Sequence, residues 1–403
     1  MQGEICLKKA LKVLLVCFLI LAATVVGSVL TLFFMSVSQS SIDTNPVRAK
    51  VDEIGACLDA YFIDDYDPDV VAQAAADGAA AAMVEATGDR WSYYISAEEM
   101  DAYNEGFYNE YVGVGITIQL AEQGLQILSV TEGGPAEEAG ILVDDILTHI
   151  DGTSSLELGV EGAKKVVRGE AGTTVHLTLL RGEETLEMDV QRRQIITPVA
   201  EGQMMDGNIG WIKIYDFETH CAEQALACME DLLDQGAEAL LFDVRFNGGG
   251  LKTEMLKVLD ALLPEGELFR SVDYAGEELI DYSDENCLDL PMAVLVNEDS
   301  YSAAEFFAAA LQEYEKAVIV GQKTVGKGNF QYTIPLSDGS AVALSVGKYY
   351  TPKGKSLTDV GITPDMEVDL SEEDYISLYY GTLEAVEDEQ LQAALSELLR
   401  KIS

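Results

Sequence analysis

Three short apolar runs constrain the fold of this chain more than any other feature of the sequence. They are Ala239-Leu-Leu-Phe-Asp-Val244, Pro291-Met-Ala-Val-Leu-Val296 and Ala317-Val-Ile-Val320. Continuous apolar runs of this length are typical of strands that are buried on both faces of a parallel sheet. Helical patterns lie between them, over residues 251–263 and 302–314. Repeated strand–helix–strand units are joined by right-handed crossovers, so we predict a layered α/β core over residues 194–370.

Polar or glycine residues follow the end of each of these predicted strands. Ser302 follows the second run, Lys327 follows the third within Val325-Gly-Lys-Gly328, and Gly248-Gly-Gly250 follows the first. Open α/β sheets build their sites at the carboxyl ends of the strands. A serine nucleophile needs a base, and a lysine that burial keeps neutral can replace the usual histidine. Histidine is found in no recognisable catalytic setting at any of its three positions, His149, His176 and His220.

Each of these residues also has a purely structural interpretation. Ser302-Ala-Ala-Glu305 is a capping box that opens a helix, and Lys327 on its own reads as a surface loop residue. Ser300 is an alternative nucleophile. Gln331 lies four residues beyond Lys327 on a predicted strand, about 13 Å away if the chain is extended. A contact between Gln331 and Lys327 therefore requires a bend, which Gly328 allows.

Charge and hydropathy restrict the class of protein. The chain has 70 acidic and 25 basic residues, a formal net charge of −45, which excludes a nucleic-acid binder that must neutralise phosphates. Near the N-terminus, Lys8, Lys9 and Lys12 precede an uncharged apolar run from Val13 to Met35, roughly 23 residues and long enough to span a bilayer. The lysines place residues 1–37 as a cytoplasmic tail and single-pass signal-anchor, with the rest outside the membrane. A cleavable signal ending near Ser38 remains an alternative.

The region from 38 to 107 is predicted to be helical. Ala72–Ala86 is rich in alanine, and Ser96-Ala-Glu-Glu99 is a capping box that opens another helix. Between them Gly88–Tyr94 is a turn whose aromatic residues we expect to serve packing. The cysteines beyond the apolar run form no metal-binding cluster, and their disulfide status stays open; they are Cys57, Cys221, Cys228 and Cys287.

Residues 108–193 resemble a PDZ domain. Strand-like alternation over Val112–Gln119 and Leu125–Val130 is followed by Gly133-Gly-Pro-Ala136 and Ile150-Asp-Gly152. The resemblance implies that backbone amides of one loop capture the terminal carboxylate of a peptide, which then adds as a strand to the sheet edge. That loop comprises Gly113, Val114, Gly115 and Ile116. Arg168 is a candidate cation near this groove.

Over roughly residues 50–370 the chain resembles the carboxyl-terminal processing peptidases, the tail-specific serine proteases of family S41. The motifs are Tyr111-Val-Gly-Val-Gly115, Asp243-Val-Arg-Phe-Asn-Gly-Gly-Gly250, Ser300-Tyr-Ser302-Ala-Ala-Glu305, Gly326-Lys-Gly328 and Gly361-Ile-Thr-Pro-Asp365. The resemblance implies that Ser302 is the nucleophile, Lys327 the general base and Gln331 the residue that positions the base. It also implies an oxyanion hole made by the backbone amides of Gly249 and Ala303. Two residues depart from the family pattern, Tyr301 where alanine is usual and Gly248 where proline or a small residue is usual.

The resemblance further implies a crotonase-like layered core with an inserted PDZ domain, a homodimer in which that domain gates access, and no metal or cofactor. The expected substrates are proteins recognised by their free C-termini. Residues 371–403, acidic and then helical, are predicted to be a dimerisation or packing appendage. The alternative function is a non-catalytic, membrane-tethered PDZ adaptor. Retention of Ser302, Lys327 and Gln331 together argues against it.

Overall fold

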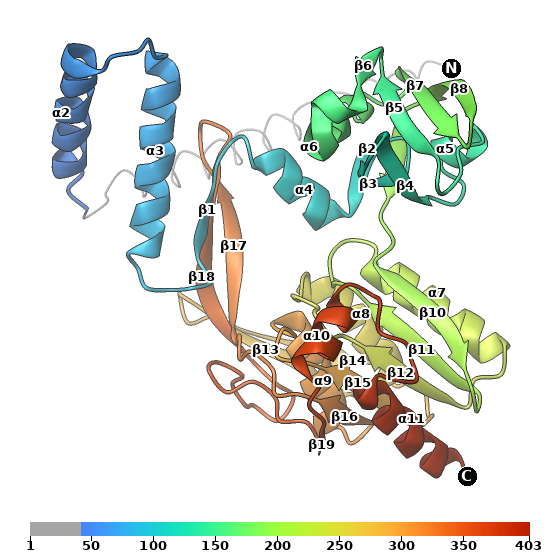
Figure 1. Cartoon of the computed structure of the whole chain (residues 1–403). Coiled ribbons are helices and arrows are strands. Elements are labelled where there is room, and N and C mark those ends of the chain that lie inside the picture. Colours follow the sequence, from blue (N-terminus) through green and yellow to red (C-terminus); the bar gives the residue numbers. More distant parts are fainter. Residues whose placement is uncertain (1–41) are drawn as a thin grey trace, which may run out of the picture. The chain divides into compact units, whose positions relative to one another are not determined.

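The computed structural model describes residues 42–403 (Figure 1), which divide between Met83 and Val84 into two compact units. The predicted anchor, Val13–Met35, and the alternative cleavage site at Ser38 lie outside the described residues. Within 42–403, no helix combines the length and the hydropathy needed to cross a membrane.

The described part of the first unit consists of two helices, α2 (Asn45–Tyr61) and α3 (Pro68–Glu85), the second of which runs two residues past the division. Proline stands in the first turn of α2, where its missing N–H costs no hydrogen bond. The alanine-rich segment lies in α3, so the predicted helix is confirmed there. Neither helix buries a residue.

Between the helices and the PDZ region, the two hydrogen bonds of the capping box predicted at Ser96 are formed, but they close a turn and do not open the helix, whose N-cap is Glu99. Ser96 N donates to the Glu99 carboxylate over 3.0 Å, and Glu99 N donates to Ser96 Oγ over 3.3 Å. Helix α4 (Met100–Tyr108) follows. The preceding turn also contains a short strand, β1 (Tyr93–Ile95), which the sequence analysis did not predict.

The PDZ region is a sheet in the order β3-β4-β5-β7-β8, with β6 paired to β5 and with two helices. The elements are β3 (Ile116–Ala121), β4 (Gly124–Val130), α5 (Pro135–Glu138), β5 (Ile146–Ile150), β6 (Thr153–Ser154), α6 (Ser155–Val167), β7 (Thr174–Arg181) and β8 (Glu184–Gln191). Alternate residues of the strands, among them Leu125, Ile127 and Leu177, form its apolar core. The entering strand β2 (Glu110–Gly113) pairs antiparallel with the leaving strand β9 (Arg193–Ile196), which ties the two ends of the region together.

The main sheet of the remaining chain has the order β10-β11-β12-β15-β16-β19, and all its pairs are parallel except the first. The strands are β10 (Ala200–Met205), β11 (Ile209–Ile214), β12 (Ala239–Asp243), β15 (Met292–Val296), β16 (Ala317–Gly321) and β19 (Met366–Glu367). Every residue of β12 and β15 is buried, so the strands predicted from the first two apolar runs are confirmed.

Helices cover both faces of this sheet. Alternate residues such as Phe242 and Val294 pack with α7 (Cys221–Asp234), α8 (Lys252–Leu262) and α9 (Ala303–Glu313). The residues between them, such as Leu241, pack instead against α11 (Glu389–Ile402), the helix of the C-terminal appendage. The appendage also contains α10 (Glu372–Tyr379). Its predicted packing role is therefore confirmed for α11, and the layered α/β core is formed as predicted.

A second sheet has the order β1-β18-β13-β14, with β17 also paired to β18. Its remaining strands are β13 (Gly266–Asp273), β14 (Glu278–Ser283), β17 (Asn329–Pro335) and β18 (Ala341–Tyr350). The strand predicted after Lys327 is β17. The four cysteines of the described chain are free thiols, and Cys221, at the start of α7, is buried.

Candidate active site

A cavity of about 680 Å³ lies where the main sheet and the second sheet meet, and it contains the predicted catalytic side chains. Ser302, Lys327 and Gln331 all line it, together with Gly248 and Gly250 of the glycine run. Ten of the other lining residues are aromatic, including Trp91, Phe269 and Tyr349. The structure therefore brings the separate sequence motifs to one place.

Ser302 stands on a sharp turn between strand β15 and helix α9. Its φ of +60° and ψ of −120° form a backbone conformation that residues with a Cβ rarely adopt. Its N–H donates to the carboxylate of Glu305 over 3.0 Å. Its side chain is half-buried and lines the cavity. A serine on a strained strand-to-helix turn presents its Oγ outward from the sheet, which is the placement that a nucleophile needs.

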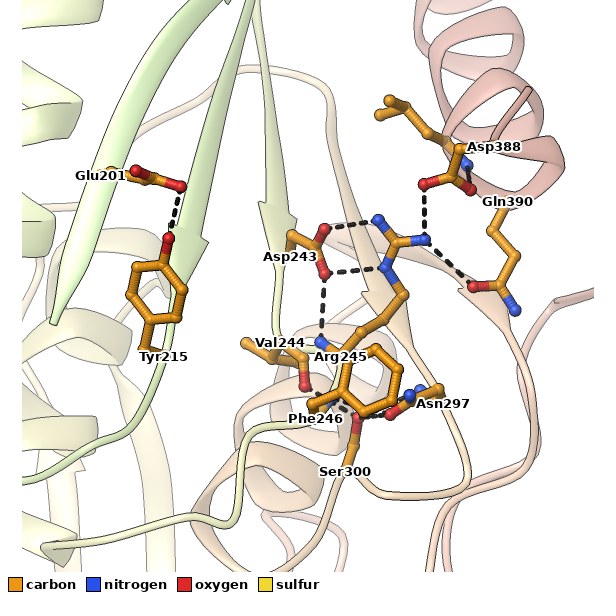
Figure 2. Close-up of polar contacts among 11 residues, drawn as sticks. Glu201, Tyr215, Asp243, Val244, Arg245, Phe246, Asn297, Ser300, Asp388 and Gln390 are labelled. Carbon is orange, nitrogen blue, oxygen red and sulfur yellow. Dashed lines mark hydrogen bonds and ion pairs between the residues drawn. The ribbon is translucent and has the colours of Figure 1, made fainter. Parts of the chain in front are cut away.

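The hydroxyl of Ser300, the alternative nucleophile, makes hydrogen bonds within the loop that follows β15 and does not face the cavity. Ser300 is fully buried, and its Oγ donates to Val244 O over 2.8 Å and accepts from Asn297 N over 3.0 Å (Figure 2). A hydroxyl engaged in this way links the end of β15 to the end of β12. The geometry assigns Ser300 a structural position and leaves Ser302 in the cavity.

Lys327 lies in the loop between β16 and β17, half-buried against aromatic rings. Its Nζ is 4.8 Å from the ring centroid of Trp91 and 5.7 Å from that of Tyr301. Burial lowers the pKa of Lys327 to about 8, although the carboxylates of Asp89, Glu305 and Glu218 each act to raise it. The burial that a lysine base requires is therefore present. No hydrogen bond joins Nζ to Ser302 or Gln331 within residues 42–403.

Gln331 does not make the contact with Lys327 that we expected. Its Nε2 donates to Ser345 Oγ over 3.2 Å and to Asn329 O over 3.3 Å. The pairing of β17 with β18 is irregular between Phe330 and Gln331. Gly328 has a different reason to be glycine, because a Cβ there would lie 2.6 Å from the backbone N of Thr358.

Glu305 connects the loop that contains Ser302, between β15 and α9, to the loop that contains Lys327, between β16 and β17. Its buried carboxylate accepts from the backbone N–H groups of Ser302, Gly326 and Lys327, over 3.0, 2.6 and 2.9 Å, and from the hydroxyl of Thr324. Burial raises the pKa of Glu305, and these hydrogen bonds oppose that rise. The capping-box pattern predicted the bond to Ser302, but no sequence signal predicted the bonds to the loop of Gly326 and Lys327, 21 residues further along the chain.

The glycine run lies directly against Ser302. A Cβ at Gly249 would be 2.7 Å from Ser302 Cβ and 2.9 Å from Ala303 N, so only glycine permits this approach. The φ of Gly249 is +95°. The two predicted oxyanion donors are thus close together, but the N–H of Gly249 donates to Asn247 Oδ1 over 2.8 Å.

The two departures from the family pattern face each other. A Cβ at Gly248 would lie 2.7 Å from the hydroxyl oxygen of Tyr301, so the large side chain at 301 needs glycine at 248. Tyr301 stacks on Trp91, with ring centroids 5.5 Å apart. Both rings lie beside the Lys327 amine. Trp91 belongs to the turn whose aromatic residues we assigned to packing alone, and that interpretation was incomplete.

The predicted peptide-binding loop joins β2 to β3, and β3 is an edge strand of its sheet. The carbonyl of Val114 accepts from Ala136 N and that of Gly115 from Thr131 N, both over 2.9 Å. Gly115 has a φ of +80°, and Ile116 begins β3. Arg168 pairs with Glu105 and lies 5.0 Å from the ring of Tyr111, so it is engaged within the chain. An edge strand next to a glycine turn is suited to strand addition.

Comparisons with known proteins agree with this arrangement. The sequence model of Peptidase family S41 matches residues 208–368, and that of the PDZ domain matches residues 126–181. The chain is 31% identical over 373 residues to the carboxy-terminal processing protease CtpA of Bacillus subtilis, covering 90% of this chain and 78% of that protein. It is 31% identical over 324 residues to a probable CtpA-like serine protease of Staphylococcus aureus, covering 79% of this chain and 64% of that relative. It thus spans slightly less than two thirds of the staphylococcal protein.

Among solved structures, the photosystem II D1 C-terminal processing protease is similar, with 27% identity and a TM-score of 0.47, covering 79% of this chain and 87% of that one. The match to Peptidase family S41 and the similarity to CtpA define the chain as a serine-type peptidase. Within that class, the chain belongs to family S41 and to its carboxy-terminal processing proteases.

Proposed function

We propose that the chain is a membrane-anchored, extracytoplasmic endopeptidase that uses a serine–lysine pair to cleave proteins recognised by their C-terminal tails. The observation that carries the proposal is that Ser302 and Lys327 line one cavity, with burial lowering the pKa of the lysine to about 8. A lysine with that pKa is neutral in a useful fraction of molecules near pH 8, so its amine can accept a proton.

In the proposed mechanism Ser302 Oγ attacks the scissile carbonyl carbon while the Lys327 amine takes the hydroxyl proton. The carbonyl π electrons move to oxygen, and backbone N–H groups of Ala303 and the glycine run stabilise the resulting oxyanion. Collapse of this intermediate breaks the C–N bond, and Lys327 gives its proton to the leaving amine. Water, activated by the same amine, then hydrolyses the acyl-enzyme and restores Ser302.

Two parts of the mechanism require a local rearrangement. Gln331 positions the Lys327 amine only if its amide leaves Ser345, and Gly249 donates to an oxyanion only if its N–H leaves Asn247. Catalytic hydrogen bonds are often long or misaligned before substrate binds and tighten in the complex. We propose that substrate binding brings both groups into place.

Recognition of the substrate tail is assigned to the PDZ domain. The backbone amides around Gly113–Ile116 would bind the terminal carboxylate, and the tail would pair with the free edge of β3. Backbone capture needs no basic side chain, which suits a chain with a net charge of −45. A tail held there increases the local concentration of the scissile segment at the cavity.

The apolar run Val13–Met35 with its flanking lysines supports a single-pass anchor with the peptidase outside the cytoplasm. Resistance of the protein to carbonate extraction, lost on deletion of residues 1–37, is the expected result. Release of the intact chain by carbonate would contradict it. We also propose a homodimer, as the family resemblance implies, which sedimentation of the detergent-solubilised chain would test.

Labelling by a fluorophosphonate, which modifies activated serines, tests the catalytic assignment. We expect labelling of the native chain, none of Ser302→Ala, and retained labelling of Ser300→Ala per folded molecule, with folding followed by circular dichroism. Equal labelling of Ser302→Ala would disprove the nucleophile assignment. A native chain that binds C-terminal peptides yet takes up no label would indicate the adaptor function instead.

A further inference from the structure

The C-terminal segment contacts two of the three loops that form the candidate active site. We call residues 371–403 the C-terminal brace; they comprise α10 and α11 and lie beyond the region that matches the peptidase family, which ends at residue 368. One loop is the glycine loop, residues 244–250, which follows β12. The other is the serine loop, residues 297–302, which follows β15.

The first contact is a buried network of charges around Arg245 (Figure 2). On one side the guanidinium donates to both oxygens of Asp243, over 2.9 and 2.6 Å. On the other side its Nη1 donates to Asp388 Oδ2 over 2.8 Å and to Gln390 Oε1 over 3.2 Å. The side chains of Asp243, Arg245 and Asp388 are each less than 5% exposed. Removing one partner of such a network leaves a buried charge without compensation.

This network acts on the backbone that leads into the glycine run. Burial alone would raise the pKa of Asp243, but the adjacent Arg245 lowers it, so the pair stays ionised and fixed at the end of β12. From there, Phe246 N donates to Asn297 Oδ1 over 2.9 Å and Tyr301 N donates to Asn247 O over 3.1 Å. Asn247, whose side chain accepts the hydrogen bond of Gly249 N, lies two positions beyond Arg245.

The second contact is aromatic and lies at the next residue. Phe246 has a φ of +61°, which a residue with a Cβ adopts only when its surroundings hold it. Its ring packs edge-to-face against those of Tyr375 and Tyr379 on α10, at centroid distances of 5.0 and 5.4 Å. The hydroxyl of Tyr375 also bonds Asp299 in the serine loop. The brace therefore contacts the serine loop as well as two consecutive residues of the glycine loop.

We propose that the C-terminal brace contributes to catalysis, because it holds the glycine loop in the position that catalysis requires. This inference rests on the proposed function. Asp388 and Tyr379 are positioning residues, because they act on the glycine loop through Arg245 and Phe246 and touch no substrate. Displacement of an oxyanion loop by a fraction of an ångström weakens stabilisation of the transition state more than it weakens substrate binding.

Asp388→Asn separates positioning from folding. Asp388 Oδ1 accepts from Leu391 N over 3.0 Å and caps α11, and asparagine keeps that acceptor. Its amide nitrogen then faces the Arg245 guanidinium in place of the Oδ2 acceptor. We expect kcat for a tail-bearing peptide to fall roughly tenfold to a hundredfold, with KM unchanged because the PDZ domain is intact. The matched control is Glu397→Gln on the same helix, whose partner Arg400 is 71% exposed; it should leave both constants unchanged.

Tyr379→Ala provides a second test that leaves the buried charges intact. Tyr379 is 63% exposed, so its removal is compatible with folding, yet it takes one ring away from Phe246. We expect a smaller fall in kcat in the same sense, again at constant KM. This variant decides the question if Asp388→Asn fails to fold.

All rates are measured well below the unfolding temperature and normalised to the folded fraction. Wild-type kcat in both variants would overturn the proposal, as would a change confined to KM. A failure of the proposed function itself looks different, because the native chain would then cleave no peptide or Ser302→Ala would cleave as well as the native chain.

Discussion

The PDZ domain and the peptidase core differ in how far their charged pairs are buried. In the PDZ domain the surface proposed for recognition is the backbone edge of β3, and its ion pairs, such as His176 with Glu187, keep at least one partner well exposed. In the peptidase core, the Asp243–Arg245–Asp388 network and the Glu305 carboxylate are buried. Lys327 is also removed from much of the solvent.

This difference follows from what each region is proposed to do. Strand addition needs only exposed N–H and C=O groups, so surface acidity does not interfere with it. Proton transfer needs a shifted pKa and fixed donors, and both require burial. We therefore expect substitutions in the core to change kcat and substitutions in the PDZ loop to change KM.

The largest expected effect is that of Ser302→Ala on cleavage. Loss of a serine nucleophile should lower the rate by at least about 10⁴-fold, since only binding and oxyanion stabilisation remain. Affinity for a C-terminal peptide should be unchanged, because the side chain lines the core cavity and not the β3 edge. Cleavage is followed by mass spectrometry and affinity by fluorescence anisotropy. A parallel loss of peptide affinity would show that the peptidase core also takes part in recognition of the tail.

The pH profile of the native chain should show the lysine base directly. Because only the neutral amine accepts a proton, kcat/KM should rise about tenfold per pH unit below a midpoint near pH 8 and then level off. Tyr301→Ala admits water beside Nζ, so the midpoint should move upward, toward the ordinary lysine value. Tyr282→Ala, which removes an exposed tyrosine on β14 that does not line the cavity, is the control. A downward shift would show that the ring acts on the amine mainly by cation–π attraction, which favours the charged form.

Residues at the ends of strands were predictable from the sequence. The apolar runs specify which segments are buried strands, and the parallel order places their carboxyl ends at one edge. Ser302, Lys327 and the glycine run therefore meet in the structure as their positions in the sequence suggested. Local patterns such as the capping box at Ser302 also predicted one bond of Glu305 correctly.

Contacts between distant layers were not predictable. Arg245 and Asp388 are 143 residues apart, and their pairing depends on how α11 packs across the sheet, which periodicity does not specify. Trp91 approaches Lys327 because β1 joins the edge of the second sheet beside β18. The present partners of Gln331 depend on a side-chain rotamer and a strand irregularity, and neither leaves a signal in the sequence.

Gly115→Ala should act on recognition alone. Gly115 has a φ of +80°, and a Cβ there would lie 3.0 Å from Thr131 Cβ, so the loop that is proposed to bind the carboxylate must shift. We expect KM for a tail-bearing peptide to rise about tenfold, equivalent to about 1.4 kcal/mol, at constant kcat. Gly182→Ala is matched in backbone strain, with a φ of +63°, but has open space around its Cβ. A fall in kcat for Gly115→Ala alone would mean that the PDZ domain also controls chemistry.

The smallest expected effect distinguishes the regions by the sign of their pH dependence. The exposed His176 ring bonds Asp189 and Glu187, each over 2.7 Å, and these bonds, the one to Asp189 first, raise its pKa. The resulting stabilisation is complete below the unfolded value of about 6.5 and is lost as the pH rises through the higher folded pKa. Protection factors for hydrogen exchange at β7 and β8, which compare the observed rate with the intrinsic rate at each pH, should therefore fall slightly over that range in the native chain but not in His176→Ala. The value of kcat/KM rises with pH over the same interval, because Lys327 must lose a proton to act as a base. His176, in contrast, must keep its proton to form its ion pairs. Protection factors in the native chain that do not change with pH would show that these surface ion pairs contribute nothing to the stability of the PDZ domain.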